Sequence, residues 1–448
     1  MPFPEKTYLT RPVRRLIMAC LVLSFFILAP LVLLYTMGYR FDLATQSIKT
    51  TGVLNIDILP KRATVKINDV ILDDTMPIKL FNRAPGTYTV EISADGYHTW
   101  KKDIRIESNQ TTYIKGLTLF ADNTPPEISG TTEVVGARHI FFAPNGNKSI
   151  MVLPTTTTQE IHLVDNASAE RYSSITTTPL DSTINVMWSD NGEHAAIVLN
   201  EQTQKRLFTI STNSEQTKPL TEIIIPTSTP LHYQWTDTLL SSASLFVGTS
   251  TLSTKITNET LSPLNYPSST AIWYTADGND VWSYSTTTRS LSRNGEMFFS
   301  SLDADTILFA TESAALIKTG NQHTHITKEW DGAQRATILP GPHSIYIPQT
   351  REWVLYSPYE IALLYADGTY NTIYRTDEPI LSVLALEDTG VILITKKNQL
   401  IGFNPGFYTS QLLLQTDNIE SVGVDQSRRT IYFYGTHQTK RNLHSLQY

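Results

Sequence analysis

The sequence lacks most of the groups that covalent or metal chemistry needs. Only one of its 448 residues is a cysteine, Cys20, and it lies in the most apolar stretch of the chain. The remainder therefore cannot use disulfides, cysteine-ligated metals or a cysteine nucleophile. No nucleophile elbow, HExxH motif, phosphate-binding loop or dinucleotide fingerprint occurs in the sequence. These absences disfavour the common enzyme classes, and we predict no catalytic, cofactor-binding or metal-binding residue.

Charged residues are also scarce, at 17% of the chain, and their balance is acidic. The formal net charge is −7, and because the first 37 residues contribute +3 (four Lys or Arg against one Glu), the rest carries −10. An acidic surface repels polyanions. We therefore expect neither nucleic acid nor anionic lipid as a partner of that part.

Charge is absent altogether from Leu16 to Leu34, a run of nineteen residues. A helix of this length rises about 29 Å, close to the hydrocarbon thickness of a bilayer. We predict a transmembrane signal anchor over residues 16–37 that follows a cytoplasmic tail of residues 1–15. The membrane is thus an expected partner, through one N-terminal helix.

Three other interpretations of this run are weaker. A core helix would carry polar residues at a 3.6-residue period, and the run has no polar face. A cleavable signal peptide has a shorter apolar region and a small-residue cleavage site, which Tyr35–Tyr39 does not offer. A lipoprotein signal at Cys20 needs an apolar region before it, but Arg14 and Arg15 stand there.

The flanks of the run predict its orientation. Four Lys or Arg residues precede it, whereas Arg40 and Asp42 follow it as a nearly neutral pair. Basic flanks remain in the cytoplasm. We therefore expect a single-pass protein with a cytoplasmic N-terminus and an extracytoplasmic chain from about Gly38 onward, of which residues 38–50 form a connector.

Residues 51–120 have the pattern of a small β-sandwich. Leu54, Ile56 and Ile58 alternate with polar residues, as in a strand with one buried face. Similar runs recur, separated by Pro, Gly, Asn and Asp residues that form turns. About 70 residues with five to seven short strands fit a sandwich.

The same residues resemble a PEGA domain. The elements that carry the resemblance are Pro60 with Ala63, Val65–Asn68, Pro77 with Leu80, Pro85–Tyr88, and Gly96-Tyr97 with Trp100. The sequence departs from the signature at Arg62, where the family has glycine. The resemblance implies an extracytoplasmic β-sandwich module of a prokaryotic envelope protein that mediates binding, without catalytic residues.

After a stiff linker at residues 121–130, the chain repeats itself. An aromatic strand that enters a turn recurs at Phe142–Gly146 and at Trp188–Gly192, 46 residues apart, and Trp235 follows 47 residues later. Repeats of this length, each with three or four strands, are typical of a β-propeller. The two turns resemble those of degenerate WD40-like or Tol-type propellers.

The predicted fold is therefore all-β after one transmembrane helix, with a PEGA-type sandwich followed by a propeller over residues 131–448. Division of this region by 46 gives about seven blades, and division by 40 gives eight, the alternative. We expect an early strand near Thr132–Val135 to close the ring against Ile431–Tyr434. Pairs such as Asn294-Gly295 and Asp367-Gly368 predict hairpin turns.

A few residues merit inspection as sites, although each has a simpler interpretation. Tyr97 and Trp100 are expected to fill the core of the sandwich rather than bind a ligand. His323 and His325 share one strand face, as metal ligands do, but no third ligand is evident and we expect a solvated face. The carboxylate groups of the chain fit solvated turns; they are Asp73-Asp74, Asp277–Asp280 and Asp303–Asp305.

Two functions of different classes are compatible with this organisation. The first is a membrane-anchored binding or scaffolding protein of the prokaryotic envelope, whose propeller recognises an envelope protein or glycan. The second is a propeller hydrolase or lyase that acts on envelope glycans or peptides. Converging carboxylates and histidines with strongly shifted pKa values would favour the enzyme, and exposed aromatic side chains would favour the binding protein. We expect the binding protein, because no catalytic motif is present.

Overall fold

The computed structural model describes most of the chain in two compact units, Met1–Asp122 and Asn123–Tyr448, which are treated separately below. The described residues are 11–36, 39–42, 47–72, 75–122, 125–129, 134, 136–212, 221–229, 231–236, 244–248, 253–257, 260–263, 271–276, 280–311, 314–328, 334–347, 350, 352–365, 367–387 and 390–448.

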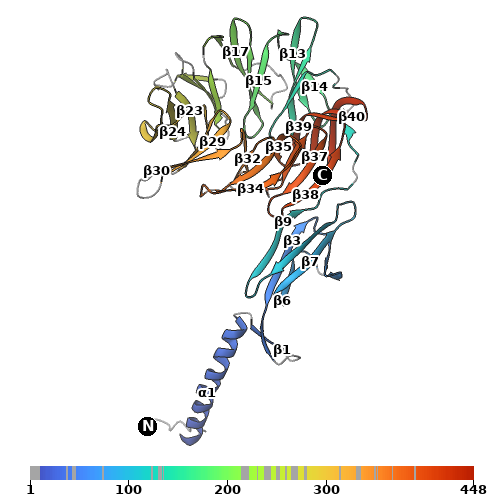
Figure 1. Ribbon diagram of the computed structural model, residues 1–448, viewed down its shortest axis with the longest axis vertical. Coiled ribbons are helices and arrows are strands. Elements are labelled where there is room, and N and C mark those ends of the chain that lie inside the picture. The colour runs from blue at the N-terminus through green and yellow to red at the C-terminus, as the bar shows by residue number, and fades with distance from the viewer. Residues whose placement is uncertain are drawn as a thin grey trace, which may run out of the picture. The chain divides into compact units, whose positions relative to one another are not determined.

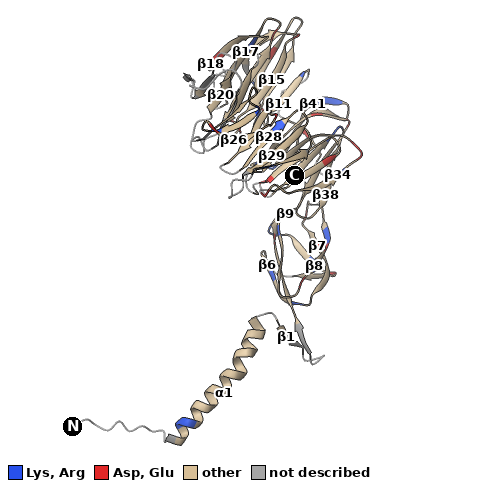
Figure 2. Cartoon of the chain, turned by 60° about the vertical axis from the view of Figure 1, so that its left-hand side comes forward, with Lys and Arg blue, Asp and Glu red and all other residues tan. Residues whose placement is uncertain are grey.

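The apolar run forms helix α1 (Arg11–Thr36), which contains Pro30. Its 26 residues rise about 39 Å, enough to cross a bilayer. It is the one helix in the described residues that is long and apolar enough to do so, and none of its span is buried. A helix of a soluble core would be mostly buried, so the core-helix interpretation does not fit. Basic residues mark the N-terminal end of α1 in Figure 2.

A short hairpin follows the helix. Strands β1 (Tyr39–Asp42) and β2 (Ser47–Thr50) are antiparallel, and Tyr39 lies directly opposite Thr50. The hairpin therefore brings Thr50 back beside Tyr39, the residue at which β1 begins.

The sandwich consists of seven strands in two sheets, within the predicted range of five to seven (Figure 1). One sheet has the order β6-β3-β9 and the other has β5-β4-β7-β8. The strands are β3 (Gly52–Leu59), β4 (Thr64–Ile67), β5 (Val70–Leu72), β6 (Ile78–Arg83), β7 (Gly86–Ser93), β8 (Trp100–Ile106) and β9 (Thr111–Thr118). Leu54, Ile56 and Ile58 point into the core, which confirms the predicted alternation.

The described residues of the second unit form eight four-stranded antiparallel sheets, numbered here as blades 1–8. Blade 1 consists of β11 (His139–Phe142), β12 (Lys148–Pro154), β13 (Thr158–Asp165) and β14 (Arg171–Pro179). Blade 2 consists of β15 (Thr183–Trp188), β16 (His194–Asn200), β17 (Gln204–Ser211) and β18 (Thr221–Pro226). Blade 3 consists of β19 (His232–Thr236), β20 (Ser244–Gly248), β21 (Ser253–Thr257) and β22 (Thr260–Pro263). Blade 4 consists of β23 (Ala271–Ala276), β24 (Asp280–Ser285), β25 (Ser290–Arg293) and β26 (Glu296–Ser300). Blade 5 consists of β27 (Thr306–Ala310), β28 (Ala314–Thr319), β29 (Gln322–Lys328) and β30 (Gln334–Pro340). Blade 6 consists of β31 (His343–Ile347), β32 (Glu352–Tyr356), β33 (Glu360–Leu364) and β34 (Tyr370–Arg375). Blade 7 is β35 (Ile380–Ala385), β36 (Ile392–Lys396), β37 (Gln399–Asn404), β38 (Thr409–Gln415), and blade 8 is β39 (Asn418–Asp425), β40 (Thr430–His437), β41 (Lys440–Gln447) with β10 (Glu127–Ile128).

These sheets form a β-propeller (Figure 1). The first strands of neighbouring blades contact one another, for example β19 with β23, β23 with β27, and β35 with β39. The contact of β11 with β39 joins the first blade to the last, so the ring is closed. The predicted propeller is confirmed.

The predicted count of seven blades is not confirmed, since eight sheets are described. The first strands of blades 1 and 2 begin 44 residues apart, whereas those of blades 5 and 6 begin 37 residues apart. The period of 46 comes from the longer early repeats and therefore gives too low a number. The alternative count of eight agrees with the sheets.

The closing strand also differs from the prediction. β10 lies within the segment expected to be a linker, and it pairs with β41 through Ile128 opposite His444. The expected strand near Thr132–Val135 lies largely outside the described residues, although the Val134 amide donates to Asn442 Oδ1 at 2.9 Å. β40, the expected partner, is already paired on both sides, with β39 and β41, and has no free edge.

The repeated turns join neighbouring blades. Trp188 Nε1 donates to the carbonyl of Phe141 in blade 1, and Trp235 Nε1 donates to that of Met187 in blade 2. Gly146 packs so closely on blade 8 that a Cβ there would lie 2.3 Å from the backbone of residues 424 and 425. The aromatic-turn repeat seen in the sequence thus has a structural reason: it forms the seams between blades.

Candidate functional site

The aromatic pair of the sandwich belongs to its core. Trp100 is 9% exposed, and the half-buried Tyr97 forms a β-bridge with Ala121. Trp100 therefore has the packing role that the sequence predicts, and Tyr97 holds the segment that follows β9 against the loop between β7 and β8.

The two histidines of β29 are not on a solvated face, so that prediction is wrong. His323 is fully buried and His325 is 8% exposed, both in the seam between blades 5 and 6, where they meet Gly341 and Gly368. His323 Nδ1 donates to the Gly341 carbonyl at 2.7 Å, while its Nε2 is buried without a hydrogen-bond partner in the described structure. Burial lowers the pKa of both imidazoles, and Lys318 and His343 add to this at His323. Strand alternation could not reveal this burial, because blade 6 supplies the cover.

The carboxylates of these turns that the structure describes have separate local partners. Asp303 forms an ion pair with Arg289 at 2.7 Å, and Asp305 Oδ2 accepts the Gly320 amide at 2.6 Å. Asp280 begins β24, whereas 277–279 and Asp73-Asp74 lie outside the described residues. Where the structure describes the chain, no three His, Cys, Asp or Glu side chains are grouped so that they could hold a metal ion.

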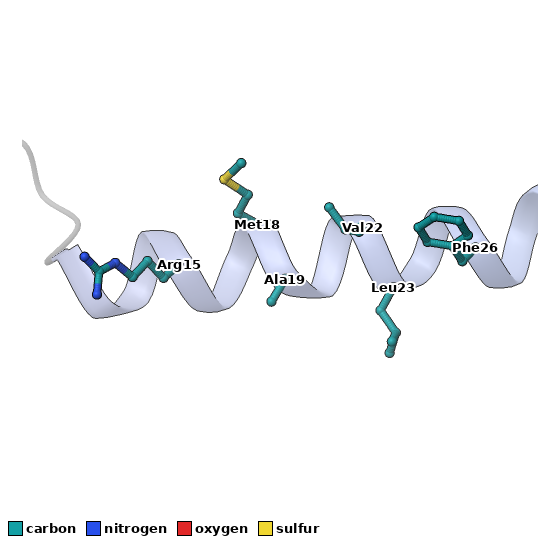
Figure 3. A pocket seen from close by; sticks show the side chains of 6 residues that line it. All are labelled: Arg15, Met18, Ala19, Val22, Leu23 and Phe26. Atoms are coloured by element: carbon teal, nitrogen blue, oxygen red, sulfur yellow. The ribbon is translucent and has the colours of Figure 1, made fainter.

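A shallow hollow runs along α1 (Figure 3). Its lining comes from a single helix, at positions three or four residues apart: Arg15, Met18, Ala19, Val22, Leu23 and Phe26. One helix cannot enclose a ligand, and lipid tails would cover this face in a bilayer. The hollow is therefore part of the surface of α1 and not a binding pocket.

Exposed apolar side chains of the propeller are concentrated in blades 6 and 7. Of ten large apolar residues that are exposed in the described part of this unit, five lie between 359 and 412. They are Tyr359, Tyr370, Leu381, Tyr408 and Leu412. Three are tyrosines, the residue type that most often anchors a bound partner together with Trp and Arg.

Tyr408 is the most constrained of the three. It is 57% exposed, and its backbone is left-handed, with φ 52°. A bulky residue seldom adopts this conformation without support from its surroundings. The support comes from the neighbouring blade, since Asn371 Nδ2 on β34 donates to the Tyr408 hydroxyl at 3.0 Å. The exposed ring is therefore held in one position.

Glu352, which begins β32, and Tyr365, which follows β33, lie at the same end of blade 6, because Trp353 pairs with Leu364. Burial raises the pKa of the Tyr365 phenol, and the nearby Glu352 carboxylate and Tyr408 raise it further, while a hydrogen bond with Asn371 opposes them. The Tyr365 phenol therefore stays neutral. We call Glu352, Tyr365, Asn371 and Tyr408 the tyrosine seam; it presents an aromatic face, a phenol, an amide and a carboxylate.

The tyrosine seam was missed by the sequence analysis. Its four residues come from four different strands or turns and span 57 positions. Tyr408 follows the Asn404–Gly406 turn, and turns that expose an aromatic residue are the one signal that could have drawn attention to it. The hydrogen bond between the blades cannot be read from sequence.

One family matches part of the chain. Residues 51–118 match the PEGA domain. The match covers the seven strands of the sandwich, so the resemblance noted in the sequence is confirmed. The PEGA domain lies directly after the hairpin β1–β2. No curated protein sequence matches the chain.

Solved structures of similar architecture are distant. Apo AztD from Citrobacter koseri is 8% identical over 67% of this chain and 94% of its own, with a TM-score of 0.43. Hydrazine synthase from Kuenenia stuttgartiensis is 9% identical over 75% of this chain and 99% of its own, with a TM-score of 0.38. Hsv2 from Kluyveromyces lactis is 12% identical over 46% and 72%, with a TM-score of 0.35. Because these scores are below 0.5, the propeller assignment rests on the sheet order and the closing strand.

Proposed function

We propose that this protein is a membrane-anchored binding or scaffolding protein of a prokaryotic cell envelope, whose extracytoplasmic propeller is the recognition head. The apolar helix α1 supports the anchor, and the PEGA domain fits an envelope protein. The basic residues before α1 support a cytoplasmic N-terminus. The propeller then lies on the outer side of the membrane.

The observation that carries the proposal is the tyrosine seam. Its exposed Tyr408 ring is fixed by a hydrogen bond from the next blade, so binding a partner there costs little side-chain entropy. Tyrosine supplies a large contact area with only two rotatable bonds, and the nearby Glu352 and Asn371 add polar contacts. Such a surface suits a protein loop or a glycan of the envelope.

The arrangement of the carboxylates supports binding rather than hydrolysis. Asp303 and Asp305 are engaged by Arg289 and by the Gly320 amide within or beside blade 5. They do not face the tyrosine seam across a described cleft. We therefore place recognition at the aromatic surface.

Site-directed crosslinking in native envelope membranes tests the proposal. We expect the wild-type protein to give a discrete adduct from a photoreactive residue placed at Gly406, two residues before Tyr408 in the same turn between β37 and β38. Tyr408→Ala removes the ring and should reduce the adduct at least about tenfold, the effect of losing an interface anchor.

The matched control is Tyr359→Ala. Tyr359 is 53% exposed in the loop between β32 and β33, at the opposite end of blade 6 from the turn that bears Tyr365. The control should retain the adduct. An equal loss in both variants, or an adduct that Tyr408→Ala leaves unchanged, would refute recognition at the tyrosine seam.

A further inference from the structure

One end of the PEGA domain presents a continuous exposed segment. Every residue from Phe81 to Thr87 is exposed, and Phe81 retains 63% of its surface. The segment lies at the end where β3 begins, because Arg83 pairs with Gly52. The exposed Phe81 lies two residues from the exposed Arg83, so this end of the domain offers an aromatic and a cationic side chain together.

The hairpin places this end close to the end of α1. Tyr39 is three residues beyond Thr36, and the strand pairing holds Thr50 directly opposite Tyr39. Paired strands are about 5 Å apart, and each residue spans at most about 3.5 Å. Gly52 therefore lies within about 25 Å of the last helical residue, whatever the orientation of the domain.

The charge of the chain is unevenly divided between the two units. Residues 38–122 contain 11 Lys or Arg and 10 Asp or Glu, a net charge of +1, whereas residues 123–448 contain 20 and 31, a net charge of −11. The acidity that argues against anionic lipid thus belongs to the propeller. The PEGA domain can approach a negatively charged membrane surface without repulsion.

Phe81 and Arg83 have the chemistry of a membrane interface. An aromatic ring is stable at the level of the headgroups, and an arginine beside it pairs with lipid phosphate. We propose that the segment Phe81–Thr87 docks on the phospholipid headgroups of the membrane that holds α1, with Phe81 inserted and Arg83 on phosphate. This inference rests on the proposed function, since it requires α1 to be in the bilayer.

Fluorescence quenching of the full chain in nanodiscs tests the docking. A fluorophore on the native Cys20 reports whether α1 lies in the bilayer, because lipids that carry a nitroxide on the acyl chain then quench it. Two further forms, in a Cys20→Ser background, carry a fluorophore at Ala84→Cys within the segment or at Arg62→Cys. Arg62 is exposed in the turn after β3, at the other end of the domain. Nitroxides on the headgroups should quench the Ala84 label at least about twofold more than the Arg62 label.

Two substitutions separate specific docking from mere proximity. Phe81→Ser should abolish the excess quenching of the Ala84 label. Arg83→Gln should remove the difference between discs that contain phosphatidylglycerol and discs of phosphatidylcholine alone. Both side chains are exposed, so neither change should unfold the domain, which circular dichroism checks.

The outcomes are distinguishable. If Cys20 is quenched but the Ala84 and Arg62 labels behave alike, or if Phe81→Ser has no effect, the docking is refuted and the anchor stands. If the excess quenching of the Ala84 label appears only in discs with two copies of the protein, the docking on lipid is refuted and the segment binds a second copy. If the Cys20 label is not quenched by acyl-chain nitroxides, the proposed membrane anchoring itself fails.

Discussion

Two seams of the propeller are built in different ways. Between blades 8 and 1, Gly146 leaves no room for a side chain, and the backbone of one blade rests on the next. Between blades 5 and 6, His323 and His325 fill the interface with imidazoles. The contact at Gly146 depends on shape, whereas the contact at His323 and His325 depends on the protonation state of the two imidazoles. Blade interfaces of one ring can therefore respond differently to the same change in conditions.

The glycine seam should show the largest effect. Gly146→Ala places a Cβ 2.3 Å from the backbone of blade 8, at a left-handed φ of 68°. We expect a loss of about 3 kcal/mol or more in the free energy of unfolding, because backbone cannot yield as a flexible side chain would. Urea unfolding followed by tryptophan fluorescence measures it.

Gly295→Ala is the control for backbone conformation. Gly295 has a φ of 84° in the hairpin between β25 and β26, and a Cβ there meets nothing within 4 Å. Gly295→Ala should lower the free energy of unfolding by only about 1–2 kcal/mol. If both substitutions cost the same, the close approach at Gly146 does not contribute.

The histidine seam should respond to pH. Burial lowers the pKa of His323 and His325 in the folded state, so the unfolded chain binds protons first. Stability is therefore complete above the unfolded pKa of about 6.5 and falls as the pH drops below it, by up to about 1.4 kcal/mol per pH unit for each histidine. His323→Gln keeps a donor for Gly341 and should make the loss between pH 7.5 and 5.0 smaller.

Leu316→Val provides the contrast within the same seam. Leu316 is fully buried beside these histidines, and its shortening should cost roughly 1 kcal/mol at every pH. A pH dependence in His323→Gln equal to that of the wild type would show that His323 does not titrate on unfolding.

The tryptophan bonds between blades should have smaller effects. Trp235→Phe keeps a ring but loses the 2.8 Å bond to the Met187 carbonyl, for an expected cost of about 1–2 kcal/mol beyond the change in ring size. Trp188→Phe loses a longer bond of 3.3 Å to Phe141 and should cost less. The urea midpoint of Trp235→Phe should be lower than that of Trp188→Phe. The reverse order of the midpoints would contradict this prediction.

An exposed ion pair should matter least. Arg289 and Asp303 are more than half exposed, so water and salt screen their attraction. Arg289→Ala should change the free energy of unfolding by no more than about 0.5 kcal/mol. A larger loss would mean that the turn before β27 contributes to a seam.

The sequence predicts those features that depend on local pattern. The alternation of Leu54, Ile56 and Ile58 identifies a strand of the sandwich, and Asn294-Gly295 forms the predicted two-residue turn, with both φ angles positive. The absence of charged residues from Leu16 to Leu34 predicts the helix α1. Each of these signals is complete within fewer than twenty residues.

The features that the sequence misses depend on contacts between distant residues. Two residues, Glu127 and Ile128, are enough to close the ring, and a strand this short has no periodicity. The burial of His323 comes from Gly341 and the next blade. The same holds for the tyrosine seam, which Asn371 and Tyr408 build across two blades.

Protease protection tests the central claim most directly. The protein carries an N-terminal epitope and is expressed in a bacterial host, and protease is added to intact spheroplasts. We predict that the propeller and the PEGA domain are digested while a membrane-bound N-terminal fragment with the epitope survives. A propeller that stays protected until the membrane is dissolved, or one released intact without α1, would contradict a membrane-anchored extracytoplasmic binding protein.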